Sequence, residues 1–149
     1  MSFFNSMNIS ATGLTAQRLR MDVISQNIAN VSTTRTSDGS PYKRKTVVFQ
    51  EMKSNEPFSS VLGRAVKRGD NMGLGVRVQK IAEDESPGIK SYDPSHPDAD
   101  NEGYVTMPNV NIVEEMVNMI SASRSYEANI TAINNTKAML SKTLEIGRG

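Results

Sequence analysis

The side chains best suited to chemistry gather in one short segment, around the only histidine of the chain. His96 is followed by acidic side chains at alternate positions, namely Asp98, Asp100 and Glu102. Alternating carboxylates are typical of the start of a calcium-binding loop, which supplies a bidentate glutamate at its twelfth position. Counted from Asp98, that position is Asn109, which is not an acid. We therefore interpret the segment as a structured acidic turn that leads into a strand, and we predict no metal site.

Two further motifs lack the residues that would complete them. Gly73 and Gly75 could begin a dinucleotide-binding loop, but the third glycine is missing and the expected strand follows the motif instead of preceding it. Ser40 and Lys43 have the spacing found in acylating serine enzymes, yet Pro41 disfavours the helix on which that motif lies. With one histidine and no cysteine, the chain has few groups for acid–base or nucleophilic catalysis. We predict that it is not an enzyme and that it carries no cofactor.

The composition predicts a thin core and excludes several classes of protein. Of the 149 residues, 37% are hydrophobic and 5% aromatic, against roughly 45–50% apolar residues in typical globular domains. Lys and Arg total 17 and Asp and Glu total 16, and this near-neutral balance argues against nucleic acid as a partner. The apolar runs are far shorter than the roughly 20 residues of a membrane span, so we predict no membrane insertion. No secretory signal pattern is visible at the N-terminus, so we expect a soluble chain or export by a route that reads no cleaved signal.

An apolar row with a seven-residue spacing predicts a helix over residues 4–31. The row consists of Met7, Leu14, Met21 and Ile28. This spacing indicates a helix that pairs with another helix, because a period of about 3.5 residues keeps the row facing its partner. The remaining side chains are mostly Ser, Thr, Asn, Gln and Arg, so we expect the other face of this helix to be polar.

A stronger periodic pattern predicts a second helix over residues 112–146. A first seven-spaced row contains Ile112, Met119, Tyr126, Ile133 and Leu140, and a second row four residues on contains Met116, Ile130 and Leu144. Asn111 is placed to cap the start of the helix, and Gly147 to end it in a left-handed conformation. A helix of this length spans roughly 50 Å, which exceeds the needs of a compact chain of this size. We therefore expect it to need a partner surface.

The middle of the chain predicts short strands separated by turns. Strands are expected at residues 45–49, 75–81 and 103–107, with Gly- and Pro-containing turns between them. The predicted fold class is α+β, with long N- and C-terminal helices that pair as an antiparallel coiled coil and a small β-rich insert between them. The expected divisions are an N-terminal helix segment at 1–33, a β-rich middle segment at 34–108 and a C-terminal helix segment at 109–149.

The helical stripes indicate a chain that is completed by other molecules. Neither stripe is flanked by the dense charge ladders of a self-sufficient coiled coil. We expect the helix pair to be marginal in the monomer and to be completed by neighbouring copies, as in a polymerising subunit. The residues of the three apolar rows are accordingly our predicted positions for helix packing and subunit contact.

Several segments resemble the axial proteins of the bacterial flagellar rod and hook. Residues 25–33, which include Asn27, Ile28, Ala29 and Asn30, resemble the N-terminal signature of rod, hook and hook-associated proteins. The continuation contains Asp38, Gly39, Pro41 and Tyr42, departs from the Thr-Pro-Gly-Tyr sequence common in that superfamily, and is similar to proximal-rod proteins. Residues 93–100, 103–111 and 114–129 are similar to the same proteins, so the resemblance covers nearly the whole chain.

The resemblance implies a structural subunit of the proximal rod of the flagellar basal body. Such a subunit is exported uncleaved through the flagellar type III apparatus and acts outside the cytoplasm, in the periplasm or cell-wall zone. It assembles with copies of itself, with FlgB-type, FlgF-type and FlgG-type rod proteins, and with the FliE-type protein that joins the rod to the MS ring. The resulting tube would transmit torque and let later subunits pass.

Three other interpretations stay open from the sequence. A cytoplasmic helical adaptor or export chaperone for axial proteins would carry similar helices, and a FlgB-type rod protein is a closer alternative. A peptidoglycan-cleaving enzyme is the third, although no acidic pair supports it. Asn27 and Asn30 are candidates for buried side-chain hydrogen bonds at the helix end, where an unpaired amide would cost about 1–3 kcal/mol; simple helix termination is the alternative for both.

Overall fold

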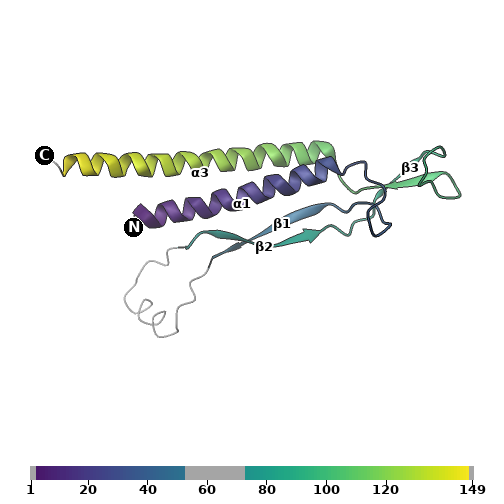
Figure 1. The fold of residues 1–149 in the computed structure, drawn as a ribbon, viewed down its shortest axis with the longest axis horizontal. Coiled ribbons are helices and arrows are strands. Elements are labelled where there is room, and N and C mark those ends of the chain that lie inside the picture. Colours follow the sequence, from purple (N-terminus) through teal and green to yellow (C-terminus); the bar gives the residue numbers. More distant parts are fainter. Residues whose placement is uncertain (1–2, 53–72, 148–149) are drawn as a thin grey trace, which may run out of the picture.

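The computed structural model describes residues 3–52 and 73–147. In chain order these contain helix α1 (Phe3–Ala29), strands β1 (Lys45–Glu51), β2 (Val76–Glu83), β3 (Ile89–Tyr92) and β4 (Tyr104–Met107), and helix α3 (Ile112–Ile146). The predicted middle segment, 34–108, therefore includes residues that lie outside the described part. Figure 1 shows an elongated molecule in which α1 lies between α3 and the β1–β2 hairpin. Strands β3 and β4 lie at one end of the molecule, and the two chain termini lie at the other end.

The two long helices run antiparallel, and the predicted α+β fold class is confirmed (Figure 1). Four of the five residues in the first predicted row of α3 lie along α1, since Met119, Tyr126, Ile133 and Leu140 are each half-buried. The fifth, Ile112, is 45% exposed and does not lie in this seam. The second row that faces α1 contains small and polar residues three positions after the first three of these half-buried residues, namely the buried Ala122 and Thr136 and the half-buried Asn129. The expected second row does not lie in this seam, because Met116, Ile130 and Leu144 are 55%, 37% and 69% exposed.

A close approach of backbones explains why small residues occupy this seam. A Cβ atom at Gly13 of α1 would lie 2.9 Å from the Asn129 Oδ1 atom of α3. The Asn129 side chain is held in place because its Nδ2 atom donates to the Ser125 carbonyl at 2.8 Å. Gly13 therefore provides the space in which the side chain of Asn129 lies.

The β1–β2 hairpin covers the other side of α1. The strands pair antiparallel from Lys45 opposite Glu83 to Glu51 opposite Val76, with a bulge between Val48 and Phe49. The Thr12 hydroxyl of α1 accepts a hydrogen bond from the Val76 N–H at 3.1 Å and donates to the Ile9 carbonyl at 2.7 Å. Both predicted strands are confirmed.

The third predicted strand is confirmed as β4, and it pairs with β3, a strand that the sequence analysis missed. The register runs from Ile89 opposite Met107 to Tyr92 opposite Tyr104, and the two tyrosine rings meet edge to face with centroids 5.3 Å apart. The residues of β3, Ile-Lys-Ser-Tyr, do not alternate between apolar and polar side chains, so this pattern does not mark the strand in the sequence.

The acidic segment after β3 forms the structured turn that was predicted. The Asp100 carboxylate accepts hydrogen bonds from the N–H groups of Glu102 and Tyr104, at 2.9 and 2.8 Å. Asp98 turns away and accepts from the Thr34 hydroxyl at 2.8 Å, while hydrogen bonds from Ser95 lower the pKa of Asp93. Each of these carboxylates therefore accepts hydrogen bonds from different backbone or side-chain groups. Among the described residues, no cluster of three potential metal ligands is found.

The ends of α3 agree with the prediction at one terminus and differ at the other. Asn111 caps the start, because its side-chain oxygen accepts from the Val113 N–H at 3.0 Å. The left-handed conformation expected at Gly147 is wrong: this residue has φ −77°. Its N–H still bonds to the Thr143 carbonyl, so the backbone continues the helical turn and no reversal is needed.

Neither described helix combines the length and hydropathy that crossing a membrane would take.

Candidate functional site

A buried polar network joins the end of α1 to the start of β1 and to the first turn of α3. We call this network the joint, and define it as Asn27, Tyr42, Arg44, Lys45 and Glu115. Asn27 and Glu115 are only 1% and 2% exposed. Buried polar atoms are costly unless they are paired, so the completeness of the pairing decides whether such a network stabilises the fold.

The Asn27 amide is paired at both its oxygen and its nitrogen. Its Nδ2 atom donates to the Lys45 carbonyl and to the Glu115 Oε2 atom, each at 2.8 Å. Its Oδ1 atom accepts from the Lys45 N–H and from the Tyr42 hydroxyl, each at 2.9 Å. The side chain thus bonds both backbone groups of Lys45, as the peptide group of a neighbouring strand would.

The buried Glu115 carboxylate is balanced by a guanidinium group. Its Oε1 atom accepts from Arg44 Nε at 2.9 Å and from Arg44 Nη2 at 2.7 Å. The Arg44 side chain is 22% exposed, so one partner of this ion pair lies at the edge of the buried network. Because removal of one partner leaves an uncompensated charge, the pair makes α3 and β1 depend on each other.

A loop after α1 delivers the remaining members of the joint. The helix ends in a turn in which the Asn30 Nδ2 atom donates to the Gln26 carbonyl at 2.8 Å, and the Thr33 hydroxyl donates to Asn30 Oδ1 at 3.1 Å. The chain reverses at Gly39, which has φ 78°, and the Tyr42 N–H then bonds to the Thr33 carbonyl at 3.1 Å. This returning loop places Tyr42 and, two residues later, Arg44 against the end of α1.

The environment of Tyr42 favours its neutral form. Burial, followed by the negative charges of Glu83 and Glu115, raises the pKa of the Tyr42 hydroxyl above its ordinary value. The hydroxyl therefore keeps its proton and remains a donor to Asn27 across the neutral range. The Lys45 Nζ atom lies 5.8 Å from the centre of the Tyr42 ring and 3.8 Å from the Glu83 carboxylate.

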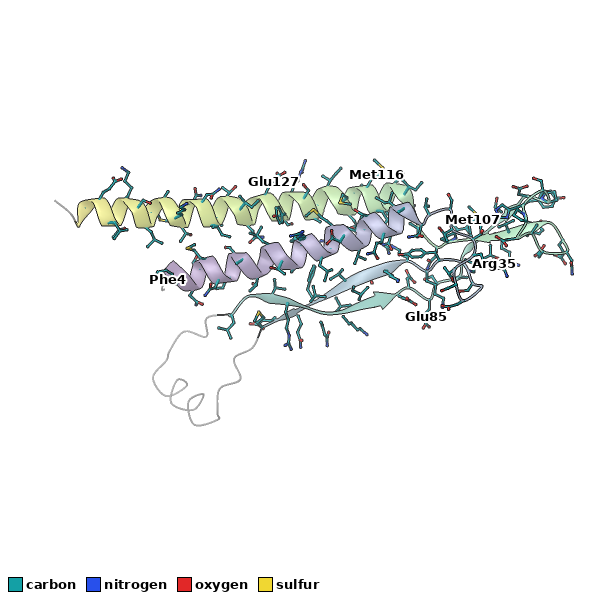
Figure 2. All side chains as sticks on the ribbon, viewed as in Figure 1. Phe4, Arg35, Glu85, Met107, Met116 and Glu127 are labelled. Carbon is teal, nitrogen blue, oxygen red and sulfur yellow. The ribbon has the colours of Figure 1, made fainter. Side chains whose placement is uncertain are left out.

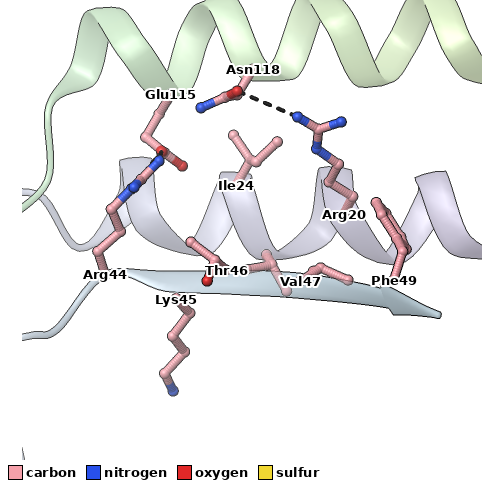
Figure 3. A pocket seen from close by; sticks show the side chains of 10 residues that line it. Arg20, Ile24, Arg44, Lys45, Thr46, Val47, Phe49, Glu115 and Asn118 are labelled. Atoms are coloured by element: carbon pink, nitrogen blue, oxygen red, sulfur yellow. Dashed lines mark hydrogen bonds and ion pairs between the residues drawn. The ribbon is translucent and has the colours of Figure 1, made fainter. Parts of the chain in front are cut away.

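Beside the joint, a groove of about 360 Å³ opens between α1, β1 and α3 (Figure 3). Its lining includes Val23 and Ile24 of α1 and Val47 and Phe49 of β1. The Arg20 guanidinium crosses toward α3 and donates to the Asn118 Oδ1 atom at 3.4 Å. The groove is thus apolar on its floor, with a positive charge on one wall.

The structure brings some of the predicted site residues together and separates others. Asn27 and Tyr42 share a hydrogen bond, whereas Asn30 bonds locally at the helix end and Asp38 and Gly39 are exposed in the loop turn. Pro41 is half-buried in the same loop and is not one of the joint residues. Of the signature residues next to Asn27, Ile28 is half-buried and Ala29 is exposed.

Comparison with known proteins agrees with this geometry at both ends of the chain. The family model described as "Flagella basal body rod protein" matches residues 7–35, and the model described as "Flagellar basal body rod FlgEFG protein C-terminal" matches residues 101–146. The flagellar basal-body rod protein FlgC of Borreliella burgdorferi is 52% identical, with 100% of both chains covered. The FlgC proteins of Bacillus subtilis and Salmonella typhimurium are 51% and 40% identical, each over 99% of this chain and 100% of the relative.

The chain belongs to the FlgC family of flagellar basal-body rod proteins.

Membership of the FlgC family makes the chain a structural protein of the flagellar basal-body rod. In this FlgC-family chain the joint connects the two segments that match rod models. Asn27 lies in the first matched segment and Glu115 in the second, and they contact each other directly.

Sequence reasoning missed the charged half of the joint. Arg44 stands between Lys43 and Lys45, and Glu115 stands beside Glu114 at the start of a helix, where acidic residues are common, so neither residue is distinctive in the sequence. A signal was nevertheless present, since Glu115 is in the same seven-residue phase as Ala122, Asn129 and Thr136. That row of small and polar residues is the row that faces α1.

Proposed function

We propose that this chain is a subunit of the proximal rod, where it polymerises with other rod proteins into a hollow drive shaft. The observation that carries the proposal, together with family membership, is the surface of α3. In the described part of the chain, large apolar side chains along this helix remain exposed after α1 has packed against it, among them Val113, Val117 and Leu144. Such a surface needs neighbouring molecules, and stacking of subunits would supply them.

The fold suits a part that must bear torque. The joint ties both long helices to β1, so a load on one helix passes to the other through hydrogen bonds and an ion pair. In a tube of many such pairs, packed helices would share the load in parallel. The terminal segments, 1–33 and 109–149, would form the inner helical layer, and residues 34–108 would form an outer part with contacts between subunits.

The proposed assembly has definite partners. They are copies of this chain, FlgB-type, FlgF-type and FlgG-type rod proteins, and the FliE-type protein at the MS ring. The subunit would leave the cytoplasm uncleaved through the flagellar type III export apparatus. Its final place would be extracytoplasmic, in the part of the rod that crosses the periplasm or cell-wall zone.

Isolation of basal bodies separates this proposal from its alternative. A tagged chain that complements a deletion strain should co-purify with intact basal bodies and appear as density in the proximal rod by cryo-electron microscopy. A cytoplasmic adaptor or export chaperone would stay in the soluble fraction. Recovery of the chain only from the cytoplasm of motile cells would overturn the proposal.

A pair of neighbouring substitutions tests the packing on which the rod depends. Ile133→Asp places a charge in the half-buried α1–α3 seam. Asn134→Asp introduces the same charge at an exposed position, where aspartate has nearly the shape of the asparagine that it replaces. We expect Ile133→Asp to abolish swimming although the protein is still made and exported, and Asn134→Asp to leave swimming intact. Normal swimming with Ile133→Asp would contradict the packing role.

A further inference from the structure

The first three turns of α3 carry an apolar ridge on the face turned away from α1. The ridge consists of Ile112, Val113, Met116, Val117 and Ile120, which are 45–69% exposed. Their spacing places them on one side of the helix, opposite the buried Glu115 and Ala122. Figure 2 shows Met116 on this outer side, with Glu127 further along the helix. No described part of the chain covers the α3 ridge.

The ridge and the groove beside the joint lie at the same height, that is, at the same position along the long axis of the molecule. Glu115 and Asn118 of α3 line the groove, and the ridge residues occupy the same turns of the helix on its other side. Figure 3 shows the groove bounded by β1 and α3 above the α1 floor, with Arg44 and Glu115 near one end. One chain therefore presents a convex apolar surface and, on a different side of α3, a concave surface with an apolar floor and polar or charged walls.

Their charges are also complementary. The ridge is flanked by the exposed carboxylates of Glu114 and Glu127. The groove carries the Arg20 guanidinium on its wall, where its recorded hydrogen bond is a long one to the neutral amide of Asn118. Opposite charges at the rim of an interface favour one pairing and orientation over others.

We propose that the α3 ridge of one copy packs into the groove of a second copy that lies beside it at the same height. The contact is heterologous, so in a pair one copy keeps its groove free and the other keeps its ridge free, and the contact repeats as a ring or a helical row. This inference rests on the proposed rod function, because it describes how adjacent copies of the chain touch within the rod.

Engineered cysteines test this contact directly, because the natural chain has none. Val117→Cys lies on the ridge and Val47→Cys lines the groove. In purified basal bodies under oxidising conditions, the double variant should form disulfide-linked dimers and larger multiples, with peptides around positions 117 and 47 joined. Each single variant should stay monomeric on a non-reducing gel. Val47→Cys combined with Gln79→Cys, an exposed position on β2, is the matched control and should also give no multiples.

The possible results separate this contact from the rod function. Absence of multiples from the double variant, in basal bodies that contain the chain and turn normally, would overturn the contact and leave the rod function standing. A photoreactive residue at position 117 identifies the occupant: capture of residues 44–50 of another copy supports the proposal, and capture of a different rod protein overturns it. Absence of the unsubstituted chain from basal bodies would overturn the rod function and this contact together.

Discussion

Asn27 acts in this fold as a substitute for a strand neighbour. A helix cannot normally continue the hydrogen bonding of a sheet, because its own backbone groups are already paired. The Asn27 amide bonds both backbone groups of Lys45. Its oxygen also accepts a hydrogen bond from the Tyr42 hydroxyl, and its second N–H donates to the Glu115 carboxylate. One side chain therefore fixes the position of α1, β1 and α3, which a hydrophobic contact could not do with the same directional precision.

The ion pair in the joint should be costly to break on one side only. Glu115→Ala removes the carboxylate that accepts two hydrogen bonds from Arg44 and leaves that guanidinium with the more distant Asp84 carboxylate, 3.9 Å away. It also leaves one Asn27 donor without an acceptor. Since Arg44 is partly exposed, we expect a loss of about 2–3 kcal/mol in the free energy of unfolding, below the roughly 3–5 kcal/mol of fully buried pairs. Urea titration of Glu115→Ala, Arg44→Ala and the double variant measures this. A double variant as unstable as the sum of the single variants would contradict direct coupling.

Tyr42 should make the fold sensitive to alkaline pH. Its folded-state pKa is raised above the ordinary value of 10.0, so the unfolded chain loses this proton first as pH rises. The stabilisation is complete below pH 10 and is lost as pH rises through the folded-state pKa. We expect the unfolding free energy to fall more steeply above pH 10 in the natural chain than in Tyr42→Phe. Parallel curves for the two proteins in this range would show that Tyr42 has no such effect.

At the scale of elements, the α1–α3 pair is held by two different kinds of row. One row of α3 is apolar and half-buried, and the other contains Ala122, Asn129 and Thr136, which let the backbones approach. Further large apolar residues of α3 lie outside this seam, on the outer face, where they form the ridge. A helix with apolar residues on two faces can pair within the chain and still contact another molecule.

The close contact at Gly13 predicts a coupled effect of two substitutions. Gly13→Ala should improve helix propensity by about 1 kcal/mol, but its Cβ atom would meet the Asn129 side chain at 2.9 Å. We expect the two effects to offset each other, so that Gly13→Ala alone changes the unfolding free energy little. In an Asn129→Ala background, where this side chain is absent, the same substitution should stabilise by about 1 kcal/mol. Thermal unfolding of the four proteins provides the measurement, and equal effects in both backgrounds would argue against the contact.

Periodicity identified the main elements because they are long or alternate clearly. Two helices that extend over many turns produce repeated apolar rows, so the α+β class and the antiparallel pairing followed from rows such as that of Ile133 and Leu140. Strand β3 was missed because its four residues, Ile-Lys-Ser-Tyr, do not alternate between apolar and polar side chains. The expected left-handed Gly147 was wrong because glycine permits that conformation without requiring it.

The joint could be predicted only in part, because its members are distant in the sequence and polar. Asn27 was predicted as a buried amide through its place at a helix end, and Tyr42 through a resemblance to proximal-rod proteins. Glu115 lies 71 residues beyond Arg44, and no local pattern reveals which acid meets which base. Patterns of apolar residues locate a helix face, whereas the partner of a buried charge depends on how whole elements are placed.

At the scale of the whole molecule, the described residues form a thin hydrophobic core. The buried hydrophobic residues recorded for the described part are few, and Val23, Val105 and Val110 are among the larger of them. Burial within one molecule therefore gives limited support to the ends of the long helices.

This limited burial predicts that the helices of an isolated chain are incomplete in dilute solution. The structure contains 27 helical residues in α1 and 35 in α3. Fixing each residue costs about 1–2 kcal/mol in conformational entropy, which must be offset by contacts. The part of α3 far from the joint has few contacts within the chain, because Leu144 and Ile146 are 69% and 81% exposed. Far-UV circular dichroism of a monomer, verified by sedimentation, should therefore show fewer helical residues than these two helices contain, and the helix content should rise as the concentration permits association. A dilute monomer with both helices fully formed, and with no change on concentration, would mean that the chain is completed by its own contacts and does not depend on its neighbours.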